Sequence, residues 1–177
     1  MADIADRKTD HLDLATSGDV GFKRTTTLFE CVRLVHDALP ELDLDAIDLS
    51  STVLGKTLRA PILIAGMTGG AERAERINLE LAAIAEERGY AFGLGSQRAM
   101  LKRPESKSSY TVRRTAPTAL VLGNLGVVQA AKMSTGEIQD LAGQIGADAL
   151  CVHLNPAMEI VQQEGDRDFR GGLETLQ

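Results

Sequence analysis

Several polar side chains follow a short apolar run near the end of the chain. After residues 148–152 come His153, Asn155, Met158 and Glu159. An imidazole, a carboxamide and a carboxylate can hold a substrate, move a proton or bind a metal ion. His153 and Asn155 are two residues apart, so they share one face if the apolar run continues as a strand. A lone histidine is more often structural, but this one has a carboxamide and a carboxylate close in sequence.

Polar residues also end three earlier apolar runs at nearly equal spacing. Thr68, Ser96, Asn124 and His153 are separated by 28, 28 and 29 residues. Equivalent positions in consecutive strand–helix units would point these side chains at a common centre. Their hydroxyl and carboxamide groups could hydrogen-bond a neutral heteroaromatic ring. The alternative is that they only begin turns or cap helices. Met67 precedes Thr68 in "GMTGG", whose glycines can expose backbone N–H groups to a ligand.

Cationic side chains stand near these positions. Arg98 lies two residues after Ser96 and offers a planar fork suited to phosphate oxygens. Near the start of the chain, Arg7 and Lys8 are adjacent, and His11 follows one helical turn later. Two cations of different geometry could clamp a polyphosphate. An ordinary solvated helix face is the alternative, and the residues alone leave both open.

The elements that must position these residues recur with a fixed period. Apolar segments begin at Pro61, Tyr90, Ala119 and Asp148, each 29 residues after the last. Short runs bounded by glycine are typical of strands buried on both faces, as in parallel sheets.

The spacers between these segments have helical patterns. The first is predicted to end at Gly89 and to bury one stripe. The stripe comprises Ala74, Ile77, Leu81, Ile84 and Ala85. The third spacer opens with a capping box, Ser134 and Glu137. Residues 106–117 give a weaker helix prediction. Repeated strand–helix–strand units predict an α/β fold with a parallel sheet.

Two folds use this unit, a doubly wound sheet and a (β/α)₈ TIM-type barrel. "GLGSQR" has Arg98 where a third glycine would complete a dinucleotide fingerprint. The equal period therefore favours the barrel, whose reactive groups lie at the carboxyl ends of its strands. The chain has room for about four units, half of a complete barrel. We expect an N-terminal substrate-binding arm and lead-in segment over residues 1–60, and the first half of a barrel over residues 61–177.

Composition narrows the function classes. The chain has 177 residues, is 44% hydrophobic and carries a net charge of −6. No basic block is present, which argues against a nucleic-acid partner. No run approaches the ~20 apolar residues of a membrane helix, and the N-terminus lacks a signal-like apolar core. We expect a cytoplasmic protein without a membrane partner. Cys31 and Cys151 are expected to be buried as small hydrophobes.

Together these motifs resemble the type 2 isopentenyl diphosphate isomerases. The matching pieces are "RKTDHL", "PILIAGMTGG", "GLGSQRA", "GNLG" and "HLNPAMEIVQQEGDRDF", in the family's order over essentially the whole chain. The resemblance implies a flavoprotein (β/α)₈ enzyme that interconverts isopentenyl and dimethylallyl diphosphate. "EGDRDF" resembles the loop that closes over the family's site.

The resemblance also implies roles for single residues. Met67, Thr68, Ser96 and Asn124 match positions that hold FMN. Arg7, Lys8, His11 and Arg98 match positions around the substrate diphosphate. His153 and Asn155 match residues beside substrate and flavin, and Glu159 matches the carboxylate that holds Mg²⁺. Reduced FMN would carry out the acid–base chemistry of a 1,3-proton shift, and NADPH would keep the flavin reduced.

Two features depart from the family pattern. Met158 stands where the family has a glutamine implicated in proton transfer, and a thioether cannot replace its hydrogen bonds. The chain is also about half the family's length, so we expect a fragment or half of a split enzyme. It would be a homo-oligomer, or would be completed by a C-terminal half. Two alternatives stay open: an inactive half-barrel that needs a partner, and a relative of the FMN-dependent 2-hydroxy-acid oxidases.

Overall fold

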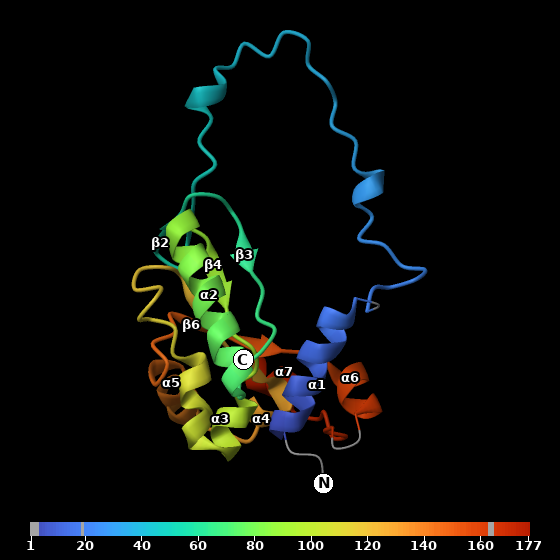
Figure 1. The fold of residues 1–177 in the computed structure, drawn as a ribbon, viewed down its shortest axis with the longest axis vertical. Helices are drawn as coiled ribbons and strands as arrows, with labels where there is room; N and C mark the ends of the chain where they lie inside the picture. The colour runs from blue at the N-terminus through green and yellow to red at the C-terminus, as the bar shows by residue number, and fades with distance from the viewer. Residues whose placement is uncertain (1–3, 19, 163–164) are drawn as a thin grey trace.

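A parallel sheet forms the centre of the molecule (Figure 1). The computed structural model describes residues 4–18, 20–162 and 165–177. The sheet has four strands in the order in which they occur in the chain. They are β3 (Leu63–Ile64), β4 (Ala91–Gly93), β5 (Val121–Gly126) and β6 (Ala149–His153). All three pairings are parallel, as the 29-residue period predicts.

Helix α2 (Glu72–Arg88) connects β3 to β4 and ends as predicted. Gly89 adopts the left-handed conformation at its C-terminus, with φ of 67°. The buried stripe is shifted from the predicted one and consists of Ala74, Asn78, Ala82 and Ala85. Asn78 replaces an apolar residue because its Nδ2 donates to the carbonyls of Thr68 and Ser109, at 3.2 and 2.8 Å. Ile84, predicted to be buried, is 46% exposed.

The connection between β4 and β5 differs from the predicted α-helix. It contains the short helix α3 (Arg98–Lys102) and a 3₁₀ helix, η3 (Pro104–Tyr110). Pro104 begins the 3₁₀ segment, and Tyr110 at its end is fully buried. Tyr110 belongs to the core cluster and so anchors this connection against the sheet.

Between β5 and β6, α4 (Val127–Ala130) precedes α5 (Thr135–Gly143). The capping box of α5 is confirmed: Ser134 accepts from the backbone N–H of Glu137, and the Glu137 carboxylate accepts from that of Ser134. The remaining elements lie toward the two ends of the chain. They are α1 (Ile4–Ser17), the 3₁₀ turns η1 (Phe29–Cys31) and η2 (Leu44–Ala46), the hairpin strands β1 (Ser51–Val53) and β2 (Lys56–Leu58), α6 (Pro156–Val161) and α7 (Gly172–Leu176).

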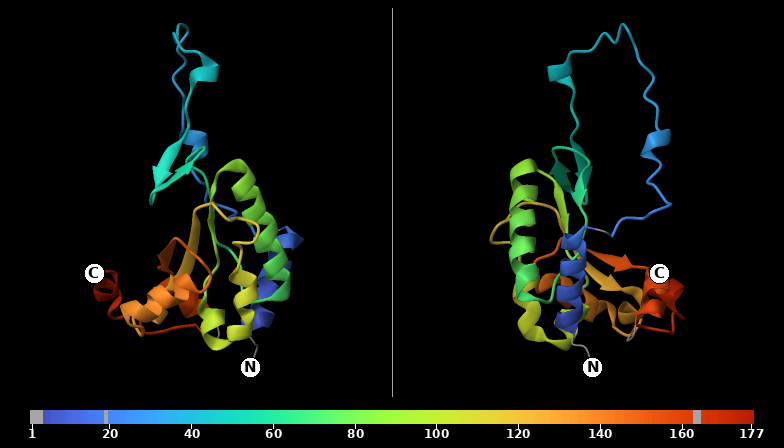
Figure 2. Two further views of the ribbon diagram at one scale, coloured as in Figure 1. Left: turned by 90° about the vertical axis from the view of Figure 1, so that its left-hand side faces the viewer. Right: turned by 45° about the vertical axis from the view of Figure 1, so that its right-hand side comes forward.

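The core lies on one face of the sheet. Phe92, Leu94, Val121 and Leu125 pack there against α2, η3 and α5. Among the described residues, the opposite face is covered at the amino end of the strands, where Leu58 of the hairpin packs on Ala91 and Leu120. β4 is buried on both faces, as predicted, whereas Cys151 and His153 on the second face of β6 are exposed, contrary to the prediction. Residues 20–49 extend away from the sheet with every described side chain exposed (Figure 2).

Both cysteines are exposed, which corrects the prediction that they are buried. Cys151 lies on the uncovered face of β6, and Cys31 lies in the extended segment. Burial fails at both positions because each would need polypeptide on a side where the described residues place none. Among those residues the sheet stays open and does not close into a barrel. No helix of the described chain is both long and apolar enough to span a bilayer.

An ion network joins the strands at the amino end of the sheet. The Asp148 carboxylate accepts from the Val121 N–H at 2.8 Å and from Arg113 Nη2 at 2.6 Å, and pairs with Lys56 Nζ at 2.9 Å. Lys56 also donates to the carbonyls of Thr118 and Ala119. One carboxylate thereby ties the hairpin, the η3–β5 connection and two strands together, at the end of the sheet opposite the candidate site.

Candidate functional site

A pocket of about 140 Å³ opens at the carboxyl ends of the strands. It brings together residues from α1, from the end of β4, from the β5–α4 junction and from the end of β6. Its lining comprises His11, Ser96, Arg98, Ala99, Gly126, Gln129, His153, Asn155, Glu159 and Gln162. An ion pair between Arg73 and Asp13 attaches α1 to α2 and so places His11 at the rim. Segments nearly 150 residues apart in the sequence thus share one cavity.

Arg98 is the cation of this pocket. It begins α3, and its backbone N–H donates to the Ser96 hydroxyl at 3.3 Å. Its Nη1 lies 3.3 Å from Glu159 Oε2 and 3.2 Å from Asp166 Oδ2. The side chains of all three residues are about three-quarters buried or more, at 18%, 26% and 18% exposure. Partly desolvated charges of this kind interact more strongly than surface ion pairs.

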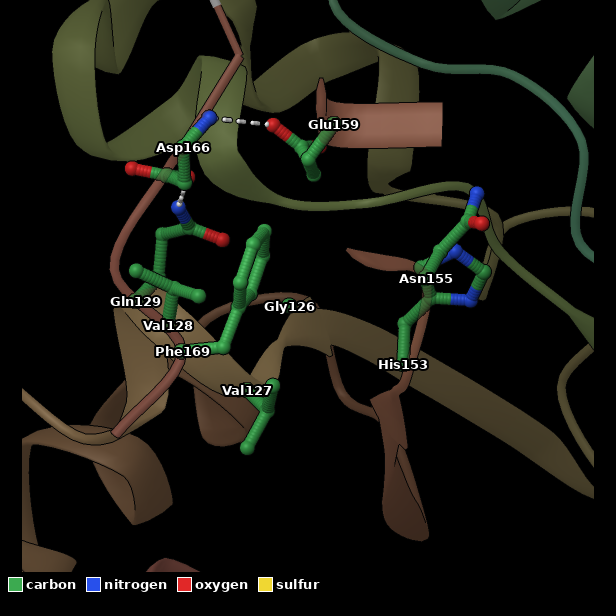
Figure 3. Close-up of a pocket in the computed structure, with 9 residues that line it drawn as sticks. All are labelled: Gly126, Val127, Val128, Gln129, His153, Asn155, Glu159, Asp166 and Phe169. Atoms are coloured by element: carbon green, nitrogen blue, oxygen red, sulfur yellow. Dashed lines mark hydrogen bonds between the residues drawn. The ribbon is translucent and has the colours of Figure 1, made fainter. Parts of the chain in front are cut away.

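Asp166 joins this pair from the segment after α6. It accepts from Gln129 Nε2 at 2.6 Å, and its backbone N–H donates to Glu159 Oε2 at 2.9 Å. A smaller pocket of about 20 Å³ lies between these residues and the end of β6. Figure 3 shows Asp166, Gln129 and Phe169 on one side of it and His153 and Asn155 on the other. Neither Asp166 nor Gln129 was predicted to belong to the site. The "EGDRDF" segment was the available signal for Asp166.

His153 and Asn155 lie at the junction of β6 and α6. His153 is the last residue of β6 and is exposed on its open face. Asn155 precedes Pro156, the first residue of α6, and its carboxamide makes no capping hydrogen bond to the described helix. Both residues line the larger pocket, and Figure 3 shows them side by side at one end of the smaller one.

The equal spacing of the strand-end residues does not place them at equivalent heights. In the parallel register His153 stands beside Gly126, and Asn124 stands beside Cys151. Asn124 and His153 share the open face, because residues two apart on a strand point the same way, but they are offset by one such step. The register therefore separates the two residues along the strands, and their convergence on a common centre stays a prediction.

Thr68 lies deeper, at the end of β3. Its side chain is 4% exposed, and its hydroxyl is buried without a hydrogen-bond partner in the described part of the chain. Gly95 lies directly against it: the Gly95 N–H donates to the Thr68 carbonyl, and a Cβ on Gly95 would stand 2.5 Å from that oxygen. The close approach of the two strand ends therefore requires glycine at this position.

Tyr110 stabilises the backbone at the end of β4, near Ser96. Its hydroxyl donates to the Ser96 carbonyl at 2.7 Å. Burial raises the pKa of this phenol far above its usual value, although Arg103 acts in the opposite direction. Tyr110 is therefore a neutral donor at any ordinary pH, and it fixes the backbone of Ser96 beside Arg98.

The pocket gathers half of the residues that the sequence analysis singled out: His11, Ser96, Arg98, His153, Asn155 and Glu159. Thr68, Asn124, Met67 and Met158 are not in its lining. Met67 is 73% exposed and Met158 is 50% exposed. Arg7 and Lys8 lie on α1, but their side chains are outside the described part of the structure.

Glu159 is the carboxylate best placed to bind a metal ion, but few other side chains that bind metals lie near it. No three His, Cys, Asp or Glu side chains of the described residues form a group that could hold a metal ion. A metal here would need oxygen atoms from a bound anion and from water. Mg²⁺ commonly binds in this way, through one or two carboxylates and substrate phosphates.

Comparison with known proteins identifies the family. Residues 2–101, more than half of the chain, match the FMN-dependent dehydrogenase family. A Synechococcus protein is 47% identical over 171 residues, which is 96% of this chain and 49% of that protein. Relatives from Methanococcoides burtonii and Xanthobacter autotrophicus are 46% and 47% identical over 96% of this chain. All three are named isopentenyl-diphosphate delta-isomerase. The chain spans about half the length of these relatives. It belongs to the FMN-dependent dehydrogenase family.

Proposed function

We propose that this chain forms the substrate-side half of an isopentenyl-diphosphate delta-isomerase that uses FMN and Mg²⁺. The observation that carries the proposal is the pocket that joins His11, Arg98 and Glu159 with His153 and Asn155. A guanidinium and an imidazole suit a diphosphate, and a carboxylate beside them suits the metal ion that accompanies it. Relatives that match nearly the whole chain are named isopentenyl-diphosphate delta-isomerase.

Thr68 and Asn124 fit the binding of FMN. The buried Thr68 hydroxyl has no partner within the described residues, and a buried polar group without a hydrogen bond is costly. A flavin ring on the open face of the sheet would supply that partner. Asn124 lies on the same face and would offer a carboxamide to the ring, with Met67 and Ser96 at the neighbouring strand ends. FMN, reduced by NADPH, would supply acid–base chemistry at its ring nitrogens.

Glu159 would hold Mg²⁺, with the remaining ligands from diphosphate oxygens and water. The Arg98 guanidinium now occupies the place of a cation beside this carboxylate, at 3.3 Å. On binding, Arg98 would turn to the diphosphate oxygens, together with His11 and, as the sequence predicts, Arg7 and Lys8. The charges of the free pocket thus already match those of a magnesium diphosphate.

His153 and Asn155 would orient the short hydrocarbon chain of the substrate. They stand across the smaller pocket from Asp166 (Figure 3). The reaction moves one proton across three carbons, so it needs precise orientation and exclusion of water. Met158 cannot donate a proton and would add only apolar contact.

An inactive chain is the second candidate, and Met158 is the observation that favours it. This side chain is half-exposed and stands outside the pocket lining. In that case the pocket would still bind the magnesium diphosphate but would not convert it. A 2-hydroxy-acid oxidase is a third candidate, since the family is named for FMN-dependent dehydrogenation. It would need neither Glu159 nor a diphosphate clamp.

We further propose that additional polypeptide covers the open face of the sheet. The four strands would be half of a (β/α)₈ barrel, covered by further strands from a C-terminal half or from a second copy. The arm over residues 1–60 would carry substrate-binding residues, although its hairpin packs on the sheet. The location would be cytoplasmic, which cell fractionation tests.

Binding of magnesium pyrophosphate tests the proposal. Calorimetry on this chain should show saturable binding of pyrophosphate that weakens at least tenfold without Mg²⁺ or in Glu159→Gln. Glu174→Gln in α7 is the matched control, since Glu174 stands apart from the pocket lining. Equal binding with and without Mg²⁺, or binding that Glu159→Gln leaves unchanged, would remove the basis of the proposal.

A further inference from the structure

Asp166 contacts several residues of the candidate pocket, and no role has been assigned to it so far. Its carboxylate meets Arg98 Nη1 at 3.2 Å and accepts from Gln129 Nε2 at 2.6 Å. Its backbone N–H donates to Glu159 Oε2 at 2.9 Å. One residue thus contacts both the cation and the carboxylate that would bind a magnesium diphosphate. Its side chain is 18% exposed, so these charges are largely withdrawn from water.

The backbone path into Asp166 is equally constrained. A Cβ on Gly165 would stand 1.7 Å from the Glu159 carbonyl oxygen, so no other residue could pass there without moving the segment. Phe169 then turns its ring into the smaller pocket beside Gln129 (Figure 3). The segment is therefore fitted against Glu159 by its backbone as well as by its charge.

The charges of the cluster show what Asp166 can do. Arg98 is shared by two carboxylates, so Glu159 does not hold it alone. When a divalent ion binds Glu159, Asp166 can keep the guanidinium at the pocket. Arg98 already donates to Glu159 Oε2 at 3.3 Å, and without Asp166 it would pair with Glu159 alone and compete more strongly with the metal ion for that carboxylate.

We propose that Asp166, anchored by Gln129, is a positioning residue that shares Arg98 with Glu159, so that Glu159 can exchange this cation for the metal ion of a magnesium diphosphate. This inference rests on the proposed function and adds a residue to it. It acts through Arg98 and Glu159 and needs no contact with the ligand.

The direction in which Asp166→Asn changes pyrophosphate binding separates the positioning role from a simple charge effect. Asp166→Asn removes a negative charge beside an anion site, and Coulomb attraction alone would then tighten pyrophosphate binding. The positioning role predicts the opposite, binding of magnesium pyrophosphate at least tenfold weaker, as for other residues that orient a metal ligand. Asp168→Asn is the matched control. Asp168 lies in the same segment, but its carboxylate pairs with the exposed Arg170.

Two further variants separate positioning from charge and from misfolding. Gly165→Ala displaces the segment without altering any charge, and should weaken binding like Asp166→Asn. Asp166→Glu restores the carboxylate and should recover part of the affinity. In ligand-free protein, hydrogen exchange of residues 165–170 should speed up in Asp166→Asn and Gly165→Ala, while α2 stays protected.

The experiment is calorimetric titration with magnesium pyrophosphate, with hydrogen exchange on the same samples. Weaker binding in Asp166→Asn and Gly165→Ala, with Asp168→Asn unchanged or tighter, supports the role of Asp166. If the unaltered chain binds and Asp166→Asn behaves like Asp168→Asn, Asp166 has no positioning role and the proposed function stands. If the unaltered chain shows no saturable binding, the proposed function fails and this inference fails with it.

Discussion

Arg98 stands at the centre of the site because its guanidinium contacts two partly buried carboxylates, Glu159 and Asp166. Its position follows from local structure: it begins α3, and Ser96 and Tyr110 fix the turn that precedes it. The sequence could identify Arg98, His153 and Glu159 by chemical type and nearness to strand ends. It could not assign Gln129, whose role depends on the path of a segment that returns from after α6.

Thr68 gives a prediction with opposite effects on stability and on binding. Thr68→Val removes a buried hydroxyl that lacks a partner among the described residues. Urea unfolding should show unchanged or greater stability, by up to about 1 kcal/mol. In a chimera that binds FMN, with residues 1–177 in place of the matching half of the Synechococcus relative, FMN titration should show affinity lower by about tenfold, the equivalent of about 1.4 kcal/mol. Loss of stability with unchanged FMN affinity would show that the hydroxyl serves the fold.

The sheet is the element that the sequence describes best. Four parallel strands in chain order follow from the 29-residue period, because such runs must be joined by crossovers. The stop of α2 at Gly89 and the capping box of α5 were also readable, because both are local. The hairpin at Ser51–Leu58 was missed although its two-residue turn at Leu54 and Gly55 is local. The 3₁₀ segment that ends at Tyr110 was not readable, because it depends on packing between distant segments.

Asp148 gives a pH-dependent prediction for the sheet. Burial acts to raise the pKa of this carboxyl, but hydrogen bonds from the Val121 N–H, Lys56 and Arg113 outweigh it and hold the pKa below its usual range. A carboxyl with a lowered folded pKa stabilises the fold above its unfolded pKa of about 4 and loses that contribution as pH falls further.

Asp148→Asn should therefore lower the free energy of unfolding by about 1–3 kcal/mol at pH 7. The difference from the unaltered chain should shrink below about pH 4, where the native carboxyl also becomes protonated. Urea unfolding at several pH values measures this, with Asp140→Asn on α5 as the control. A difference that stays constant down to about pH 2 would contradict the ionic role.

At the scale of the whole molecule, the open face of the sheet decides how the chain works. Cys151, Asn124 and His153 lie on that face, and Leu63 at the end strand is 48% exposed. Parallel sheets are ordinarily covered on both faces. The apolar pattern predicted burial on both faces, which β4 shows and the second face of β6 does not.

Cys151 reports on this face directly. In a Cys31→Ser background, the thiol should react with a disulfide reagent at nearly the rate of a free thiol. It should become protected at least tenfold in the chimera with the C-terminal half of the Synechococcus relative, because added strands would cover β6. Sedimentation of the unaltered chain measures whether a second copy covers the face instead. Equal labelling rates in chain and chimera would show that β6 faces solvent in both.

The activity of that chimera tests the central claim most directly. Conversion of isopentenyl to dimethylallyl diphosphate is followed by proton NMR in the presence of FMN, NADPH and Mg²⁺, with bound flavin absorbance as the control for folding. The account predicts conversion that requires both FMN and Mg²⁺ and rises by orders of magnitude in Met158→Gln, because the carboxamide restores hydrogen bonding that the thioether lacks. A chimera that binds FMN yet converts no substrate, even with Met158→Gln, would contradict it.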